Sequence, residues 1–298
     1  MSSGDTPAVA RRKVRLAIKD ARNAKGDTQT QVAEAMEWSL SKVMRIESGE
    51  VTISQNDLRP LLSYLGVKDR KVVEELVQAA KASKQRRQWW DDKRYQGMLT
   101  AAMRQLISFE AEASRVLSFA PAAIPGWLQT EAYALAITQQ YVGELTAQEI
   151  DARVAIRAER RKMIRRRSPW PKLFALLDES VLLRQVGGPD VLREQLAAIS
   201  AAIDEGWVSV RLHPLASPYP AFGLFDLLYL SDAENGHAVL YRESGPVDEI
   251  VDDAVRITRH REGWDRMWAG SINEEDSARM IAAAAGAASP SADEGSSD

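Results

Sequence analysis

The side chains of Leu40, Ser41, Met44 and Arg45 bring three kinds of chemistry to one short segment. An arginine guanidinium binds guanine or a phosphate, a serine hydroxyl donates or accepts at a base edge, and a leucine contacts a thymine methyl group. The offsets between these positions are those of neighbours on one side of a helix. We therefore interpret this face as one that reads the base edges of duplex DNA.

Two short helices joined by a tight turn are predicted to position this face. Thr28 and Gln31 have the spacing of a capping box, and Ser39 can cap a second helix. Apolar residues recur on the inner side of both segments: Val32, Ala33, Met36, Val43 and Ile46. Such a helix-turn-helix places its second helix in the major groove. Gln29, Ser39 and Lys42 would hold phosphates, whereas the alternative is a structural hairpin that never meets DNA.

Residues 28–49 resemble the helix-turn-helix of lambda-repressor/Cro-like (XRE-type) regulators, through Gln29, Ala33, Val43, Ile46 and the closing run Arg45-Ile46-Glu47-Ser48-Gly49. The resemblance implies an all-α domain of five helices over residues 9–84 that binds DNA. It also implies an ion pair between Arg22 and Glu47, which would fix the opening helix on the recognition helix. Glu37 stands where the family often has glycine. A left-handed backbone there would cost of order 1 kcal/mol.

The length of 298 residues suits two domains. Because the chain has no cysteine, it forms no disulfide or thiolate metal site, which fits a reducing cytoplasm. No apolar run has the length of a membrane span, and the N-terminus lacks the apolar core of a signal peptide, so we expect a cytoplasmic protein. The net charge of −3 argues against a nonspecific nucleic-acid coat. Basic residues nevertheless crowd the opening helix: Arg11, Arg12, Lys13, Arg15, Lys19, Arg22 and Lys25.

Residues 85–285 are predicted to form an α+β domain with a small, mainly antiparallel sheet. Short apolar runs of strand length occur at 172–180, 207–215, 222–232 and 237–244. A hairpin turn signal at 233–236 joins the last two runs. Helices are expected at 99–117, 130–141, 146–167, 191–206, 247–268 and 273–285. Residues 1–8 and 286–298 are small and polar, and we expect them to be disordered.

This second domain resembles the C-terminal domain of WhiJ-like regulators of sporulating actinomycetes. The most specific motif is Ile124-Pro125-Gly126-Trp127-Leu128-Gln129-Thr130, and more diffuse matches are Phe109-Glu110-Ala111-Glu112-Ala113, Arg157-Arg160-Arg161, Asp178-Glu179 and Tyr241-Arg242-Glu243. The resemblance implies a DNA-binding regulator that often acts with a small partner protein encoded nearby, in an antitoxin-like arrangement. Two alternatives remain open. One is an antitoxin proper, for which DNA binding is autoregulation, and the other is a regulator that responds to a small molecule.

Residues 153–167 carry eight basic residues against Glu159. These arginines would pair with acidic residues of their own domain, form a second nucleic-acid surface, or bind an acidic partner, and we favour the first interpretation. Trp127 follows Pro125-Gly126, a sequence that predicts an exposed turn. A partner or ligand surface is therefore expected at Trp127, Arg157, Arg160 and Arg161.

Enzymatic chemistry is poorly supported. The histidines lack the spacing of metal ligands: His213, His237 and His260. Paired carboxylates of an active site would have to meet at one sheet edge, and the candidates are Asp226, Glu243 and the pair Asp178-Glu179. The simpler interpretation is that these side chains cap helices or pair with arginines. We expect a non-enzymatic regulator without metal or cofactor. Because one short recognition helix binds weakly, we expect a homodimer that reads two half-sites of double-stranded DNA.

Overall fold

The computed structural model describes residues 7–84, 89–95, 97–140, 145–219, 223–230, 238–244 and 247–287. The chain divides into two compact units, Met1–Asp92 and Lys93–Asp298. Disorder was expected at residues 1–8 and 286–298. This is wrong for residues 7, 8, 286 and 287, which belong to the first and last helices, Pro7–Lys25 and Glu274–Ala287. Residues 1–6 and 288–298, and the predicted hairpin turn at 233–236, lie outside the described residues.

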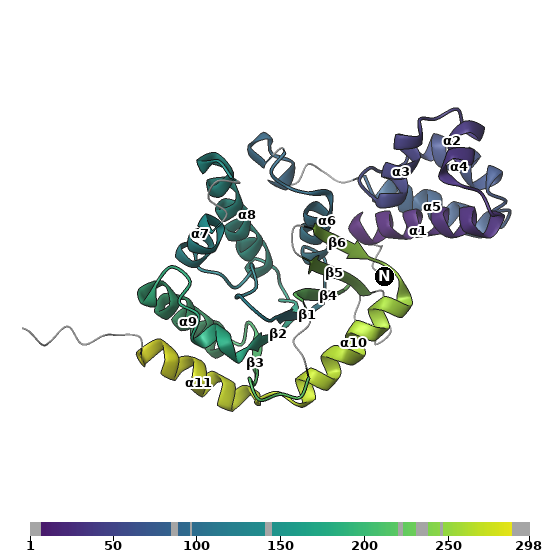
Figure 1. Ribbon diagram of the computed structural model, residues 1–298. Helices are drawn as coiled ribbons and strands as arrows, with labels where there is room; N and C mark the ends of the chain where they lie inside the picture. Colours follow the sequence, from purple (N-terminus) through teal and green to yellow (C-terminus); the bar gives the residue numbers. More distant parts are fainter. Residues whose placement is uncertain are drawn as a thin grey trace, which may run out of the picture. The chain divides into compact units, whose positions relative to one another are not determined.

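Five α-helices form the N-terminal unit over residues 7–82, as predicted (Figure 1). They are α1 (Pro7–Lys25), α2 (Gln29–Ala35), α3 (Leu40–Ser48), α4 (Gln55–Tyr64) and α5 (Arg70–Ala82). The apolar faces of all five helices meet in one core, in which Leu58, Leu62 and Ala80 are completely buried. Helix α1 packs along α5 and also contacts α3, so the longest helix of the unit is the support on which the helix-turn-helix rests.

The C-terminal unit contains a mixed sheet, with six strands in the part that the structure describes, in the order β3-β2-β1-β4-β5-β6. The strands are β1 (Arg115–Ala120), β2 (Lys172–Asp178), β3 (Ser209–His213), β4 (Phe225–Tyr229), β5 (Ala238–Ser244) and β6 (Val247–Val251). Strand β2 runs parallel to its neighbours β1 and β3, and the other three pairings are antiparallel. The expected α+β class is confirmed, and crossover helices account for the parallel pairs.

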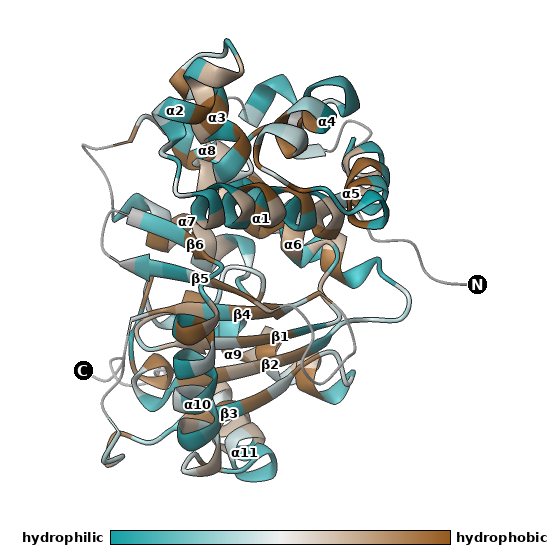
Figure 2. Ribbon diagram, turned by 90° about the vertical axis from the view of Figure 1, so that its right-hand side faces the viewer, coloured by the Kyte–Doolittle hydropathy of each residue, from teal (hydrophilic) through white to brown (hydrophobic). Residues whose placement is uncertain are grey.

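Helices cover both faces of this sheet (Figure 1). Helix α10 (Ala254–Ala269) lies on one face, and α7 (Glu131–Gln139), α8 (Ala147–Arg165) and α9 (Pro189–Asp204) lie on the other. Helix α6 (Ala101–Glu110) contacts β6, and α11 (Glu274–Ala287) packs against α9 and β3. The central strands β1, β2 and β4 are mostly hydrophobic (Figure 2), as expected for strands covered on both faces.

Two sequence predictions in this unit are wrong. The helix predicted at 99–117 ends at Glu110, and residues 115–120 form the central strand β1. The predicted helix at 247–268 begins only at Ala254, after a cap by Asp253, and residues 247–251 form the edge strand β6. Strand β1 is buried on both faces, so it has no alternating pattern that would distinguish it from a buried helix.

Candidate nucleic-acid interface

The helix-turn-helix is built by the predicted caps. The Thr28 hydroxyl accepts a hydrogen bond from the Gln31 amide at 3.2 Å, and the Gln31 side chain accepts one from the Thr28 amide at 2.8 Å. The Ser39 hydroxyl accepts from the Lys42 amide at 3.2 Å and so begins α3. Gly49, with φ of 80°, ends it. Each short helix therefore has its own start signal.

The turn between the helices explains the unusual Glu37. This residue has φ of 55°, and among described residues it is the one non-glycine with positive φ. Its amide donates to the Glu34 carbonyl at 3.2 Å, and the Trp38 amide donates to the Ala33 carbonyl at 2.8 Å. This is the double hydrogen bond of a Schellman motif, which requires a left-handed residue at the position of Glu37. The backbone cost of about 1 kcal/mol is offset by these bonds and by the packing of Trp38 on the core.

A carboxylate joins three helices behind the recognition helix. Glu47 of α3 accepts hydrogen bonds from Nε and Nη2 of Arg22 at 2.6 and 2.8 Å, so the expected ion pair with α1 is present. Its Oε2 also accepts from the Gln29 side-chain amide, at the start of α2, at 2.8 Å. Both charged side chains are largely buried, and the bond to Glu47 raises the pKa of Arg22. The three-way contact fixes α3 relative to α1 and α2.

The opposite side of α3 is open. Ser39, Leu40, Ser41, Met44 and Arg45 are exposed. Arg45 makes only a loose contact with Glu50, with Nε to Oε2 at 3.4 Å. The outward face predicted from the sequence is thus available to a ligand.

Two predicted phosphate contacts have partners inside the domain. The Lys42 ammonium lies 3.2 Å from the Asp57 carboxylate and 3.7 Å from the centre of the Trp38 ring. The Gln29 amide is held by Glu47, as described above. Both side chains retain N–H groups that could bind a phosphate. In the free protein, however, Asp57 holds Lys42 and Glu47 holds Gln29.

The basic residues that crowd α1 are only partly exposed. Arg12 and Arg15 are buried. Arg22 is paired with Glu47, and the Lys13 ammonium lies 3.7 Å from the Glu75 carboxylate. The run is therefore divided between buried or paired arginines and the exposed lysines Lys13, Lys19 and Lys25.

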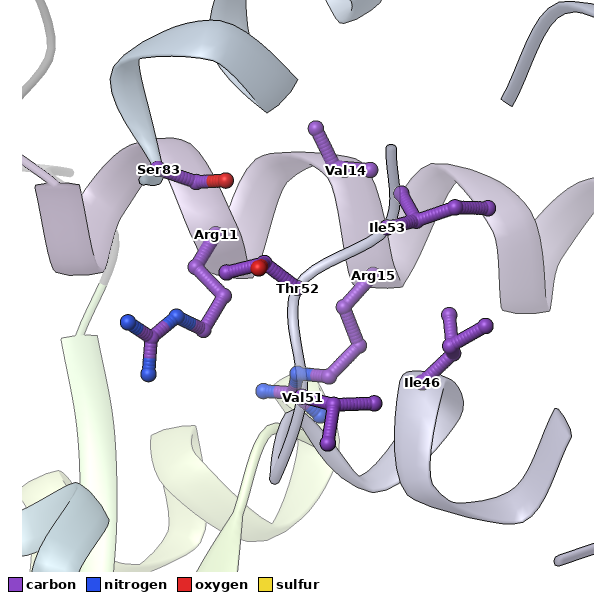
Figure 3. A pocket seen from close by; sticks show the side chains of 8 residues that line it. All are labelled: Arg11, Val14, Arg15, Ile46, Val51, Thr52, Ile53 and Ser83. Atoms are coloured by element: carbon purple, nitrogen blue, oxygen red, sulfur yellow. The ribbon is translucent and has the colours of Figure 1, made fainter. Parts of the chain in front are cut away.

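A shallow pocket in the N-terminal unit lies between α1, the end of α3 and the following loop (Figure 3). Arg11 and Arg15, one helical turn apart on α1, extend past Thr52 in the same direction (Figure 3). The other lining residues are Val14, Ile46, Val51, Ile53 and Ser83. Its volume of about 220 Å³ includes space open to solvent, and it is below the roughly 300–1,000 Å³ of typical small-molecule sites.

The expected partner surface of the C-terminal unit is not formed as predicted. Trp127 is only 1% exposed and packs edge-on against Trp207, with ring centres 5.9 Å apart. Arg160 is buried too, and both of its hydrogen bonds to the Glu110 carboxylate (2.5 and 2.8 Å) lie inside the unit. In the Pro125-Gly126 bend, Pro125 is buried and the guanidinium of Arg160 lies against Gly126. A Cβ there would be 3.3 Å from Nη1.

Three further arginines of α8 also have partners in their own unit. Arg157 donates to the Thr138 hydroxyl at 3.0 Å, and Arg161 donates to the Gln129 carbonyl at 3.2 Å. Arg165 pairs with Glu205 and lies over the Trp207 ring. Arg167, just beyond the helix, donates to the carbonyls of Glu110 and Ala113. Arg160 and Arg165 thus pair with acidic residues of their own domain, as the favoured interpretation expected, whereas Arg157, Arg161 and Arg167 bind hydroxyl or carbonyl oxygens instead.

Gln195 is a structural residue that the sequence analysis missed. It is completely buried on the apolar face of α9. Its side chain accepts from the Thr130 amide at 2.7 Å and donates to the Leu128 carbonyl at 3.0 Å. The motif from Ile124 to Thr130 is therefore a buried loop held by side-chain bonds. The sequence feature that could have revealed this buried role is a glutamine within the apolar stripe of a predicted helix.

A row of polar side chains crosses the centre of the sheet under α8. Asp226 of β4 is paired in register with Ser118 of β1 and with Tyr241 of β5. Burial, assisted by the charge of Glu110, raises the pKa of Asp226 to about 7, and the positive charge of Arg160 opposes this shift. Burial also raises the pKa of Glu243 on β5. The Asp226 carboxyl group is buried in the sheet, whereas Glu243 lies near the end of β5 and is partly exposed to solvent.

Within the described residues, no helix is long and apolar enough to cross a membrane, and no three His, Cys, Asp or Glu side chains are grouped as metal ligands. Two family models match the chain. One, described as a helix-turn-helix domain, matches residues 16–89. The other, described as a domain of unknown function (DUF5753), matches residues 103–283, more than half of the chain. No curated protein and no solved structure matches significantly.

Proposed function

The chain belongs to the DUF5753 family and carries a helix-turn-helix domain, and we propose that it is a sequence-specific transcriptional regulator of the XRE type. The helix-turn-helix domain supports DNA binding. We propose in addition that the chain binds a preferred DNA sequence, regulates transcription and catalyses no reaction.

One observation carries this proposal. The inner face of α3 is fixed to α1 and α2 through Glu47, while its outer face presents Leu40, Ser41, Met44 and Arg45 to solvent. A rigid helix with an exposed face of mixed polar and apolar side chains fits the major groove, where base edges offer hydrogen-bonding groups and thymine methyls. A purely structural hairpin would need no such exposed face.

Each predicted DNA-contacting residue has a role in this arrangement. Arg45 binds guanine or a phosphate, and Ser41 contacts a base edge. Ser39, Lys42 and Gln29 contact phosphates near the N-termini of α3 and α2. Phosphate competes with Asp57 for Lys42, so this contact contributes less than an unpartnered lysine would.

We propose a homodimer that places two α3 helices in successive major grooves, roughly 34–36 Å apart. The C-terminal unit would set the availability of these two domains by binding a small partner protein. This role of the C-terminal unit in binding a partner is supported by the resemblance to WhiJ-like regulators and by the presence of a separate compact unit. If the product of a neighbouring gene leaves the affinity of the full chain for its operator unchanged, partner control is wrong.

The test of the proposed function is an affinity selection from random duplexes with the full chain, followed by binding titrations. Arg45→Ala should weaken binding to the selected sequence by about ten-fold or more, a loss within the roughly 1–3 kcal/mol expected of a base-reading arginine. The same substitution should weaken binding to random duplexes by a smaller factor. Arg59→Ala removes an equally exposed arginine, which pairs with Glu74 on the surface, and serves as the matched control.

Two results would contradict the proposal. Selection that enriches no sequence would exclude sequence-specific binding. Equal losses for Arg45→Ala and Arg59→Ala would show that only net charge matters.

A further inference from the structure

The recognition helix exposes two large apolar side chains next to each other. Leu40 is 42% exposed and Met44 is 50% exposed. In the described part of the N-terminal unit, the other large apolar side chain of comparable exposure is Val72 on α5, at 42%. Leu40 and Met44 are four residues apart on α3, so their Cβ atoms lie about 5–6 Å from each other on one side of the helix.

The rest of the unit shows how this pair differs from ordinary surface residues. The apolar residues Val43 and Ile46 of the same helix are buried in the core. Ser41 and Arg45 form a parallel polar column beside the apolar pair, also four residues apart. A single exposed leucine needs no explanation, but an apolar column beside a polar one, on a helix fixed from behind, forms a surface with two separate chemistries.

The major groove offers a matching surface. Its hydrogen-bonding groups suit Ser41 and Arg45, and its exposed apolar groups are the C5-methyls of thymine. Successive bases on one strand rise about 3.4 Å per step, so two apolar side chains one helical turn apart reach neighbouring base pairs. The unbranched, flexible side chain of Met44 can adapt to the second methyl group.

We infer that Leu40 and Met44 together select thymine methyl groups at two neighbouring base pairs of each half-site, beside the position contacted by Arg45. This inference rests on the proposed function, because it specifies what the same helix reads. Leu40 was expected from the sequence to make one methyl contact. The structure adds Met44 and the pairing of the two side chains on one column.

The test removes single methyl groups from DNA. After the selection described above, each thymine of the selected duplex is replaced in turn by uracil, which lacks only the C5-methyl. Replacement at two neighbouring positions should each weaken binding of the wild-type chain by about four-fold, the value for one buried methyl-sized group. Replacement at other thymines should have little effect.

Protein variants assign each methyl to its side chain. Leu40→Ala should be insensitive to uracil at one of the two positions, and Met44→Ala should be insensitive at the other. Val72→Ala, an apolar truncation of similar exposure on α5, should keep the full wild-type response. All three residues are exposed, and a thermal melt of each variant confirms that the fold is retained.

The possible results distinguish a failure of the proposed DNA-binding function from a failure of the methyl-contact inference. If no sequence is selected, the proposed function fails and this inference fails with it. If a sequence is selected but uracil is tolerated everywhere, or both variants respond to uracil as the wild type does, only the inference is overturned.

Discussion

Replacing Asp226 by asparagine should change how the stability of the C-terminal unit depends on pH. Asp226 is 5% exposed at the centre of the sheet, and burial raises its pKa from 3.8 to about 7. Arg160, whose positive charge lowers the pKa of Asp226, is already engaged by both oxygens of Glu110. The folded protein therefore favours the neutral acid, whose shape and charge asparagine reproduces.

The magnitude follows from the two pKa values. Between pH 4 and pH 7 the folded state holds a proton at Asp226 that the unfolded state has lost, so the free energy of unfolding falls as the pH rises. A shift of about three units at 1.36 kcal/mol each corresponds to about 4 kcal/mol in total. The advantage of Asp226→Asn over the wild type should grow by about 2–3 kcal/mol between pH 5 and pH 8.

Urea unfolding of the full chain at several pH values measures this difference, with fluorescence of the buried Trp127 and Trp207 as the probe. Asp190→Asn changes an exposed carboxylate on α9 and serves as the control, because it should follow the wild-type profile. Glu243 shifts in the same direction as Asp226, so the variant retains some pH dependence. Parallel profiles for Asp226→Asn and the wild type would refute the reasoning.

Three further predictions concern the remaining features. Glu47→Ala leaves a largely buried guanidinium of α1 without its carboxylate, so the melting temperature of the N-terminal unit should fall by ~10 °C or more in calorimetry, and an unchanged transition would contradict a role in fixing α3. Asp57→Asn removes the carboxylate 3.2 Å from the Lys42 ammonium. Affinity for every duplex should rise by roughly two-fold or more at low salt, and equal binding in anisotropy titrations would show that the pair does not compete with phosphate. Gly187→Ala combines φ of 77° with a Cβ 2.7 Å from a side chain of α7, so it should destabilise the C-terminal unit by about 1–3 kcal/mol in urea unfolding. Gly206→Ala, with φ of 70° but open space, isolates the backbone cost of about 1 kcal/mol, and equal losses would disprove the steric clash.

The N-terminal unit could be predicted closely because its determinants are local. The caps Thr28 and Ser39 lie next to the helices that they begin, and the apolar spacing of each helix is visible within one or two turns. The ion pair of Arg22 and Glu47 came from the family resemblance. The partner contacts of Gln29 and Lys42 were not foreseen, because each depends on the fold of neighbouring helices.

The C-terminal unit was less predictable because its contacts are distant in sequence. Strand β1 pairs with β2 and β4, which lie far along the chain, and its own residues do not alternate. Likewise, the partner of Arg160 is Glu110, 50 residues away. Nothing local to α8 indicates which arginines become buried, so Trp127 and Arg160 were assigned to a surface that they do not reach.

The inward use of the α8 arginines has a consequence for DNA binding. Lys and Arg outnumber Asp and Glu in the N-terminal unit, whereas acidic residues predominate in the C-terminal unit. Because acidic residues exceed Lys and Arg in the larger unit, and four arginines of α8 bind acceptors inside it, a polyanion such as duplex DNA is repelled by this unit. The salt dependence of operator affinity, which measures counterion release, should therefore reflect phosphate contacts of the N-terminal unit alone.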